Sequence, residues 1–459
     1  MLLRNIKKIH FVGIGGAGMS AIAKVMLALG FEVSGSDISK SETIYKLEQL
    51  GATIYIGHDS SNIADAEAIV VSTAIADSNP EVSEAQKQGI AVFHRADMLA
   101  YIMENKQGIA IAGAHGKTTT TSMIAMMLEK AEADPTVLIG GELAYLNGNA
   151  KLGTGRFVVA EADESDGTFL KLAPQIAVVT NIENDHMDFY KTMDNILVTF
   201  KKFLHKLPVE TGVAILCYDN QYVRDIAKDF SGKIISYGLD FDADYRAHNI
   251  RINGSSTIYD VHYRGHLLGT VTINVPGRHN VANSLAAVAL GCHIGLDFTQ
   301  IANGLAAFQG VKRRFQTKGR VKGVWVVDDY AHHPTEIITT LNGARDMNPK
   351  RLICIFQPHR YSRTSFLREE FGRAFQAADH LILTDVYAAG ELPIAGVSGE
   401  LIKQEIERQT SQHPTYIPDK HKITRYLLEF IEPGDLVMTM GAGDIYRIGE
   451  ELVEKLAQR

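Results

Sequence analysis

The chain has 459 residues, more than a single hydrophobic core usually serves, so we expect two or three domains. Hydrophobic residues at 46% and charged residues at 22% are typical of a globular protein that folds along its whole length. The formal net charge of -7 provides no broad basic surface, which argues against nucleic acid as a partner.

Three cysteines, at positions 217, 292 and 354, lie far apart in apolar company. We expect them to be buried thiols in a reducing compartment. The start of the chain contains no signal-peptide segment, and no apolar run is long enough to span a bilayer. The sequence therefore predicts a cytoplasmic protein that does not insert into membranes.

The chain opens with the pattern of a Rossmann-like unit. A buried strand is predicted over residues 8–12, followed by the glycine turn of residues 13–18 and a helix over 19–29. A second strand over 31–35 leads to Asp37, placed like the acid that contacts a ribose in dinucleotide sites. Such a turn holds a diphosphate, which NAD and a nucleotide sugar both supply, or it merely packs a helix on a strand.

Two further residue pairs in this unit lie where ligand loops would follow strands. A strand predicted over residues 68–72 leads into Ser72 and Thr73, and His94 and Arg95 follow another strand-like run. Each of these residues could equally be a helix cap or a solvated surface group.

A second unit begins at residue 108 with the pattern of a phosphate-binding loop. An apolar strand runs into a glycine turn at Gly113, and Lys117 and Thr118 stand at the start of the following helix. The amides of residues 113–118 can point at phosphate oxygens, Lys117 can reach a terminal phosphate and Thr118 can hold Mg²⁺. The pattern predicts an ATP site, and the alternative is a capped glycine turn with an exposed lysine.

Two acidic loops follow buried strands in this unit. The strand near residues 156–160 ends in the carboxylates of residues 161–166, and residues 177–188 repeat the arrangement with a loop that contains His186. Crowded carboxylates are electrostatically costly unless cations such as Mg²⁺ neutralise them. Parallel strands would bring both loops to the sheet edge that carries the phosphate loop. The alternative is that Glu161 and His186 only hydrogen-bond within their loops.

The second unit continues with mixed elements. Residues 212–237 alternate strands and helices, and residues 245–274 alternate polar and apolar side chains like an antiparallel meander. An alanine-rich helix follows, at whose start Asn280 or Asn283 could contact a base or cap the helix. We expect the unit to end near residue 310.

The last unit starts with Arg313 and Arg314, which could follow phosphate charge at a domain junction or form a solvated basic turn. Polar residues then cluster where two buried strands end, at residues 328–336 and 357–364. Their arginines and histidines suit a small carboxylate or zwitterionic substrate, although the adjacent histidines could instead cap the core. Buried strands of a parallel sheet are predicted at residues 324–327, 352–356, 381–385 and 436–440.

A diphosphate turn, an ATP-type loop and an anion pocket together describe an enzyme that joins two substrates at the expense of ATP. Over nearly its whole length the chain resembles the bacterial Mur ligases. The resemblance rests on seven motifs in order: Gly13-Ile-Gly-Gly-Ala-Gly-Met19, Gly113-Ala-His-Gly-Lys-Thr-Thr119, Glu161-Ala-Asp-Glu-Ser-Asp166, Asn181-Ile-Glu-Asn-Asp-His-Met-Asp188, Asp328-Asp-Tyr-Ala-His-His-Pro-Thr335, Gln357-Pro-His-Arg-Tyr-Ser-Arg363 and Asp385-Val-Tyr-Ala-Ala-Gly-Glu391.

The resemblance implies three α/β domains: a Rossmann-like UDP-sugar domain over residues 1–107, a central P-loop ATPase-type domain over 108–312 and a Rossmann-like amino-acid-binding domain over 313–459. It implies an ATP- and Mg²⁺-dependent ligase that adds L-alanine to UDP-N-acetylmuramate through an acyl phosphate. This reaction would serve peptidoglycan synthesis, and through it cell shape and division. The partners would be small molecules, and we expect a monomer or weak homodimer.

By the same resemblance the motif residues fall into sites. The UDP-sugar would contact Gly13, Gly15, Gly16, Ala17, Gly18, Asp37, Ser72, Thr73, His94 and Arg95. ATP would contact Gly113, Ala114, His115, Gly116, Lys117, Thr118, Thr119, Asn283 and Asp329, with Mg²⁺ on Thr118, Glu161 and His186. The amino acid would contact Tyr330, His332, His359, Arg360 and Arg363. Catalysis would rest on Lys117, His186, Arg314, His332 and His359, with His332 or His359 accepting the amine proton near neutral pH.

Three other functions compete with this one. A recycling ligase that attaches an intact tripeptide to the same UDP-sugar shares the phosphate loop and acidic strands. A nucleotide-gated binding protein would need no amino-acid pocket, and an NAD-dependent dehydrogenase rests on the glycine turn of residues 13–18 alone. The later motifs favour the alanine ligase.

Overall fold

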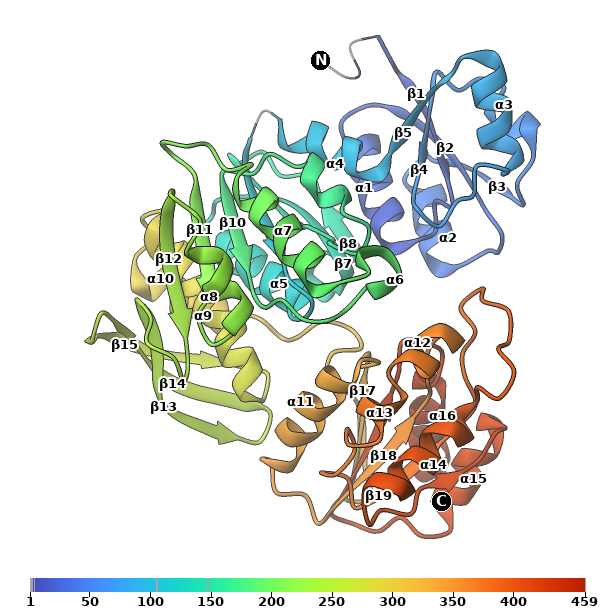
Figure 1. The fold of residues 1–459 in the computed structure, drawn as a ribbon, viewed down its shortest axis with the longest axis vertical. Coiled ribbons are helices and arrows are strands. Elements are labelled where there is room, and N and C mark those ends of the chain that lie inside the picture. The colour runs from blue at the N-terminus through green and yellow to red at the C-terminus, as the bar shows by residue number, and fades with distance from the viewer. Residues whose placement is uncertain (1–2, 4, 105, 147, 459) are drawn as a thin grey trace. The chain divides into compact units, whose positions relative to one another are not determined.

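The computed structural model describes residue 3 and residues 5–104, 106–146 and 148–458 (Figure 1). Part of the chain start, on which the expectation of no signal segment rests, lies outside the described residues. Among the helices of the described part, none combines the length and hydrophobicity needed to cross a bilayer. The chain forms two compact units: Met1–Asn249 with Tyr259–Thr272 and Val281–Phe308, and Ile250–Ile258 with Ile273–Asn280 and Gln309–Arg459.

The first sheet has five parallel strands in the order 3-2-1-4-5, and it confirms the predicted Rossmann-like unit. The predicted strand over residues 8–12 is β1, and the predicted helix begins at Ala17 rather than at residue 19. Of the two edge strands, β3 was not predicted, because its side chains are mostly exposed, whereas β5 is the strand-like run expected to lead to His94 and Arg95. The strands are β3 (Thr53–Ile56), β2 (Glu32–Asp37), β1 (Lys8–Val12), β4 (Ala68–Val71) and β5 (Ala91–His94), and the helices are α1 (Ala17–Ala28), α2 (Glu42–Gln49), η1 (Ser60–Ile63), α3 (Pro80–Gln88) and α4 (Arg95–Met103).

The second sheet contains the phosphate strand β6 between β10 and β9, and both neighbours pair with it in parallel. This order confirms that the two acidic loops emerge at the same edge as the phosphate loop. The strands β13, β14 and β15 are consecutive neighbours joined by two-residue turns, as the predicted meander requires. The strands in sheet order are β15 (His266–Ile273), β14 (Ser256–Tyr263), β13 (Tyr245–Asn253), β12 (Lys233–Gly238), β11 (Val213–Cys217), β10 (Ile176–Val179), β6 (Gln107–Ala112), β9 (Phe157–Glu161), β7 (Thr136–Leu143) and β8 (Gly148–Lys151). The helices are α5 (Lys117–Lys130), η2 (Ala144–Leu146), η3 (Thr168–Lys171), α6 (Met187–Tyr190), α7 (Met193–Leu204), α8 (Gln221–Ala227), α9 (Arg278–His293) and α10 (Phe298–Ala306).

The third sheet has six strands and confirms the predicted α/β character of the last unit. All its neighbouring strands run parallel except the first pair, β16 and β17. The strands in sheet order are β16 (Gln316–Val321), β17 (Val324–Asp329), β21 (Asp435–Met440), β18 (Arg351–Phe356), β19 (His380–Leu383) and β20 (Thr415–Tyr416). The helices are α11 (Pro334–Arg345), α12 (Tyr361–Phe366), α13 (Arg368–Phe371), α14 (Gly399–Gln409), η4 (Lys420–Lys422), α15 (Ile423–Leu428) and α16 (Tyr446–Gln458).

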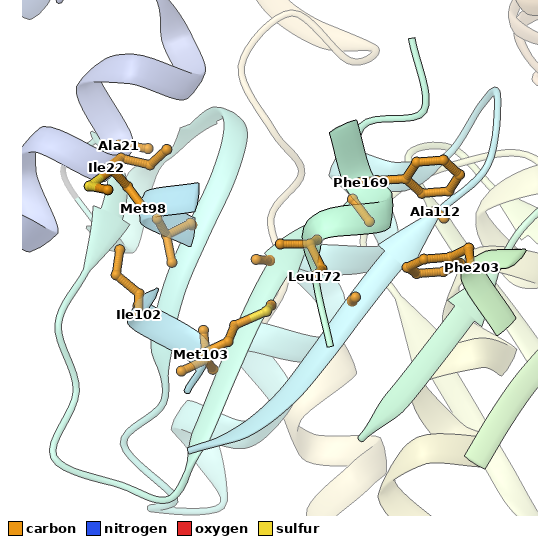
Figure 2. Close-up of a cluster of buried hydrophobic side chains, with 14 of the residues drawn as sticks. Ala21, Ile22, Met98, Ile102, Met103, Ala112, Phe169, Leu172 and Phe203 are labelled. Atoms are coloured by element: carbon orange, nitrogen blue, oxygen red, sulfur yellow. The ribbon is translucent and has the colours of Figure 1, made fainter. Parts of the chain in front are cut away.

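One hydrophobic core runs through the first unit from the helices of the five-stranded sheet to the phosphate strand (Figure 2). It includes Ile22 of α1 and Met98 of α4, and it continues to Ala112 at the end of β6. Phe169 and Phe203 belong to the same core, and their rings stack with centroids 4.7 Å apart. The shared core explains why the segments before and after residue 107 form one compact unit, while the domain boundaries themselves stay a prediction.

Candidate active site

The phosphate loop connects β6 to α5 through two glycines in left-handed or related backbone conformations. Gly113 has φ 134° and Gly116 has φ 83°. A Cβ atom on Gly113 would lie 2.2 Å from Thr180 Oγ1, so no other residue fits. One on Gly116 would lie 2.6 Å from Asn283 Oδ1, which places the Asn283 side chain against the loop.

The loop is held in shape by two residues that follow β10, Thr180 and Asn181, whose role was not predicted from the sequence. Thr180 Oγ1 donates to the carbonyl of His115 at 2.6 Å. Asn181 accepts the amides of Ala114, at 3.2 Å, and His115, at 2.8 Å. These two amides were expected to face a phosphate, but here they brace the loop. The amides at the start of α5 remain the candidates for binding the anion.

Lys117 lies in the acidic site that the sequence predicted. Its Nζ is 2.8 Å from Glu164 Oε1 and donates to the carbonyl of Gly113 at 2.6 Å. Burial alone would lower the pKa of Lys117, but the carboxylates of Glu164 and Asp163 outweigh it and raise that pKa. Lys117 therefore keeps its charge, aimed at the acidic loop rather than at solvent.

The expected metal ligands are only partly brought together. Thr118 Oγ1 donates to Glu161 Oε2 at 3.1 Å, and burial raises the pKa of the Glu161 carboxyl. The other oxygen of Glu161 accepts the Gly140 amide at 2.6 Å. His186 starts α6 with φ 55°, and its Nε2 lies 3.6 Å from Asp185 and 3.9 Å from Glu164. His186 therefore pairs with Asp185 and Glu164, whereas Thr118 pairs with Glu161.

The acidic loop also contacts residues expected to bind the UDP-sugar. Arg95 Nη2 lies 2.6 Å from Asp163 Oδ2, and Thr73 Oγ1 donates to Asp166 Oδ2 at 2.5 Å. His94 caps α4 by accepting the Ala96 amide at 3.2 Å, so the capping alternative holds for it.

The glycine turn of the first sheet is shaped by the end of β2. The carbonyl of Ser36 accepts the amides of Gly13 and Ile14 at 2.8 and 2.9 Å. Asp37 Oδ2 accepts the Gly15 amide at 2.9 Å, so one oxygen of the expected ribose ligand already supports the turn. The turn ends at Gly16, the N-cap of α1, and Ala17 and Gly18 lie in the first helical turn. Ser72, after β4, is partly buried.

In the second unit, the segments that follow β17, β18 and β19 bring four rings into one row. The ring centroids of Tyr330 and His332 lie 5.4 Å apart, and those of His332 and His359 lie 5.8 Å apart. His359 stacks on Tyr387 at 5.7 Å, and Arg363 Nη1 lies 3.2 Å from His359 Nδ1. The sequence thus predicted that the two loops meet, but it did not single out Tyr387.

Glu336 is a further residue that sequence reasoning missed. Its Oε1 accepts from Arg314 Nη1 at 3.3 Å, and its Oε2 accepts the amide of His332 at 3.1 Å. His333 caps α11, which supports the capping role weighed for that histidine. A glutamate three residues after a helix cap was a visible sign of the capping box, although not of the contact with Arg314.

The two neighbouring arginines have different partners. Arg313 donates to the carbonyls of Gly441 at 2.6 Å and Gly443 at 2.9 Å, so the glycine turn that follows β21 holds the Arg313 side chain in place. Arg314 instead pairs with Glu336. Asp329 accepts the amides of Phe315 and Ala331, and burial raises its pKa to about 6.

The histidines of the row are poor bases in this structure. Burial lowers the pKa of His332 to about 3, and burial together with Arg363 lowers that of His359 to about 4. The expectation that one of them accepts an amine proton near neutral pH therefore lacks support. Both imidazoles are neutral at pH 7 and can accept a hydrogen bond.

The low pKa of His332 predicts how stability depends on pH. In the unfolded chain this group titrates near pH 6.5, so its contribution to the free energy of unfolding is present above about pH 6.5. It is lost as the pH falls toward about 3. Between these limits, the free energy of unfolding should fall less steeply with decreasing pH for His332→Gln than for the unmodified chain. The slopes should differ by up to about 1.4 kcal/mol per pH unit, and thermal melts at a series of pH values measure them.

His413→Gln is the matched control, because the His413 side chain is 84% exposed. Its melting curve should follow the unmodified chain across the whole pH range. Parallel curves for His332→Gln and the unmodified chain would contradict the burial effect.

Comparison with known families places three matches along the chain. They are the Mur ligase family catalytic domain at residues 8–107, the Mur ligase middle domain at 111–291 and the Mur ligase glutamate ligase domain at 313–443. All residues of the loops and the ring row described above lie within these ranges.

Individual relatives match over almost the full length. The UDP-N-acetylmuramate–L-alanine ligase of Geotalea uraniireducens is 53% identical over 452 residues, which cover 98% of each chain. The solved UDP-N-acetylmuramate–alanine ligase of Thermotoga maritima is similar with a TM-score of 0.84 and 28% identity, covering 98% of this chain and 99% of that one. A murein peptide ligase of Psychrobacter arcticus follows with a TM-score of 0.73 and 27% identity, covering 99% of each chain.

Proposed function

The chain belongs to the Mur ligase family, and we propose that it uses ATP to join L-alanine to UDP-N-acetylmuramate, releasing ADP and phosphate. The observation that carries the proposal is the match across 98% of both chains to a relative of that name, because it includes the phosphate loop, both acidic loops and the ring row. We further propose that the protein acts in the cytoplasm on small molecules, as a monomer or weak homodimer.

The chemistry explains why ATP is needed. A carboxylate is a poor electrophile because neither oxygen can leave. Transfer of the γ-phosphoryl group from ATP to one lactyl oxygen makes an acyl phosphate and ADP. The alanine amine then attacks the acyl carbon, and phosphate leaves with that oxygen as the amide forms. The enzyme must offset the phosphoryl charge and bring the amine to the carbonyl.

Lys117 and the start of α5 serve the phosphates of ATP in this proposal. The partly buried cation and the helix N-terminus both favour a polyphosphate; His115 lies in the loop, and Thr119 and Asn283 border it. Lys117 leaves Glu164 and reaches the terminal phosphate when ATP is present.

Thr118 and Glu161 fit a Mg²⁺ site because a hydroxyl and a partly buried carboxylate, 3.1 Å apart, are the oxygen donors that this ion prefers. Bound Mg²⁺ would neutralise the phosphate oxygens during transfer. His186 serves in this proposal by orienting Glu164 and Asp185, which lie within 3.9 Å of its ring.

The glycine turn serves the diphosphate of the UDP-sugar, with Asp37 directed at the ribose. Arg95 and Thr73 complete this site next to the acidic loop, where Arg95 is paired with Asp163. The pair brings a nucleotide-sugar contact within hydrogen-bonding distance of the residues that serve ATP. No redox cofactor is needed, since the turn holds only a diphosphate.

The ring row of the second unit serves the amino acid. Arg360 and Arg363 suit the alanine carboxylate, while Tyr330, His332 and His359 line the space beside it. Both histidines are neutral, so their part is to accept hydrogen bonds from the amine rather than to hold its proton.

A substrate panel tests the proposal against the recycling ligase. The protein is incubated with ATP, Mg²⁺ and UDP-N-acetylmuramate plus L-alanine, glycine, L-serine or the L-alanyl tripeptide. Phosphate release and product mass are then measured. We expect the L-alanine adduct at the highest kcat/KM. Product from the tripeptide but not from L-alanine would overturn this choice, and phosphate release without the sugar nucleotide would favour a nucleotide switch.

A further inference from the structure

One carboxylate, Glu81, is completely buried in the five-stranded part of the first unit and has no part in the reaction described above. It is the second residue of α3, after the Asn79 cap, whose side chain accepts the Glu81 amide at 2.9 Å. A buried carboxylate is costly unless hydrogen bonds replace its lost hydration. Its partners therefore indicate what the group is for.

Four side chains from different segments surround Glu81. Its Oε2 accepts from Ser36 Oγ at 2.7 Å and from His58 Nδ1 at 2.9 Å. Its Oε1 accepts from Asn62 Nδ2 at 2.7 Å and lies 3.6 Å from His10 Nε2. One carboxylate thus joins β1, the end of β2, the segment after β3 and η1 to α3.

The charge state of Glu81 determines the direction of these bonds. Burial works to raise its pKa, but the nearby His10 ring and the hydrogen bonds from Asn62, Ser36 and His58 outweigh burial and lower it to about 2. At neutral pH the group is ionised and can only accept, so the Ser36 hydroxyl and His58 Nδ1 must both donate to it. The rotamer of the Ser36 hydroxyl and the tautomer of His58 follow from Glu81.

Ser36 connects this cluster to the glycine turn. Its carbonyl accepts the amides of Gly13 and Ile14, and the next residue, Asp37, accepts the amide of Gly15. The fit is close, since a Cβ on Gly35 would lie 2.6 Å from Ile14. A shift of the end of β2 would therefore move the amides of the turn.

We propose that Glu81 is a positioning residue for the nucleotide-sugar site, holding the end of β2 through Ser36 and His58 so that the glycine turn fits a nucleoside diphosphate. The inference rests on the proposed function, in which that turn holds the UDP group. Glu81 touches no substrate in this account, so its loss weakens affinity for UDP and leaves the ATP site unchanged.

The test is the variant Glu81→Gln, which keeps the size of the side chain but introduces an NH₂ group where only donors face it. UDP binding is measured by calorimetry, and KM for ATP and kcat are measured at saturating UDP-N-acetylmuramate. We expect the Kd for UDP to rise about tenfold, the effect of one lost charged hydrogen bond, with KM for ATP and kcat within about twofold. A general loss of folding would instead change all three.

The matched control is Glu84→Gln, the same change one turn later on α3, where the side chain is 26% exposed and bonds Gln88. This variant should bind UDP like the unmodified chain. An unchanged Kd in folded Glu81→Gln, or an equal rise in KM for ATP, would overturn the inference.

Ser36→Ala is a second variant that keeps the test decisive if Glu81→Gln does not fold. It removes the hydroxyl but leaves the carbonyl that holds the turn. We expect weaker UDP binding here too, and a combined effect with Glu81→Gln smaller than the sum, because both break one connection. Unchanged binding in Ser36→Ala, or full additivity, would count against the inference.

UDP binding needs neither alanine nor turnover, so the two proposals can fail separately. A chain that binds UDP but makes no alanine product would overturn the proposed function, whereas variants that bind UDP normally in an active ligase would overturn only the role of Glu81. A chain that binds no UDP would overturn both.

Discussion

Replacing Lys117 with alanine is expected to lower kcat about a thousandfold while leaving the Kd for UDP-N-acetylmuramate within about twofold. Lys117 is the cation at the start of α5, and neighbouring carboxylates raise its pKa, so it is charged throughout the working pH range. Its loss removes the charge proposed to offset the transferred phosphoryl group. The glycine turn of residues 13–18, proposed to hold the UDP group, gains or loses no contact.

Two comparisons make the result specific. Lys130→Ala removes an exposed lysine from the other end of the same helix and should leave kcat unchanged. The double change Lys117→Ala with Glu164→Gln avoids leaving a buried carboxylate without its partner at 2.8 Å. It should recover stability but not turnover. Loss of UDP-sugar binding in the folded double variant would argue against separate nucleotide sites.

Replacing Gly113 with alanine is expected to weaken ATP binding at least about a hundredfold. The new Cβ would lie 2.2 Å from Thr180 Oγ1, which bonds the His115 carbonyl, and 2.9 Å from the Asn181 carbonyl. Since these groups brace the loop, the clash must distort it, beyond the backbone strain of about 1–3 kcal/mol. ATP affinity is measured by calorimetry, with UDP affinity as an internal reference.

Gly51→Ala isolates the clash from the strain. Gly51 also has a positive φ, 99°, but an added Cβ there would meet no atom within 4 Å. We expect Gly51→Ala to lower the melting temperature while ATP binds normally. Equal ATP affinity in both variants would show that the packing of Thr180 against the loop is unimportant.

Local patterns predicted much of this fold. The strand over residues 8–12 is apolar and followed by a glycine turn, and the strand before Gly113 is buried on both sides, so neither depends on distant partners. The edge strand β3 could not be found this way, because its mostly exposed side chains leave no periodic apolar signal.

In the candidate site too, residues within local motifs were predicted, whereas residues that depend on distant segments were not. Lys117, Glu161 and His359 stand in motifs whose composition already indicates their chemistry. The roles of Asn181, which braces the loop, and Tyr387, which stacks on His359, depend on chain segments that meet only in the folded state. The Asn-Pro-Glu sequence that ends at Glu81 predicts a helix start, but not the burial of its carboxylate.

Isotope transfer from the substrate carboxylate tests the central claim that ATP activates this group for capture by alanine. UDP-N-acetylmuramate labelled with ¹⁸O in both lactyl carboxylate oxygens is incubated with the protein, ATP, Mg²⁺ and L-alanine, and the released phosphate is analysed by mass spectrometry. The account predicts one ¹⁸O atom in each phosphate and one retained in the new amide. Amide formed with unlabelled phosphate would contradict it, because no bond between the carboxylate and phosphorus would then have formed.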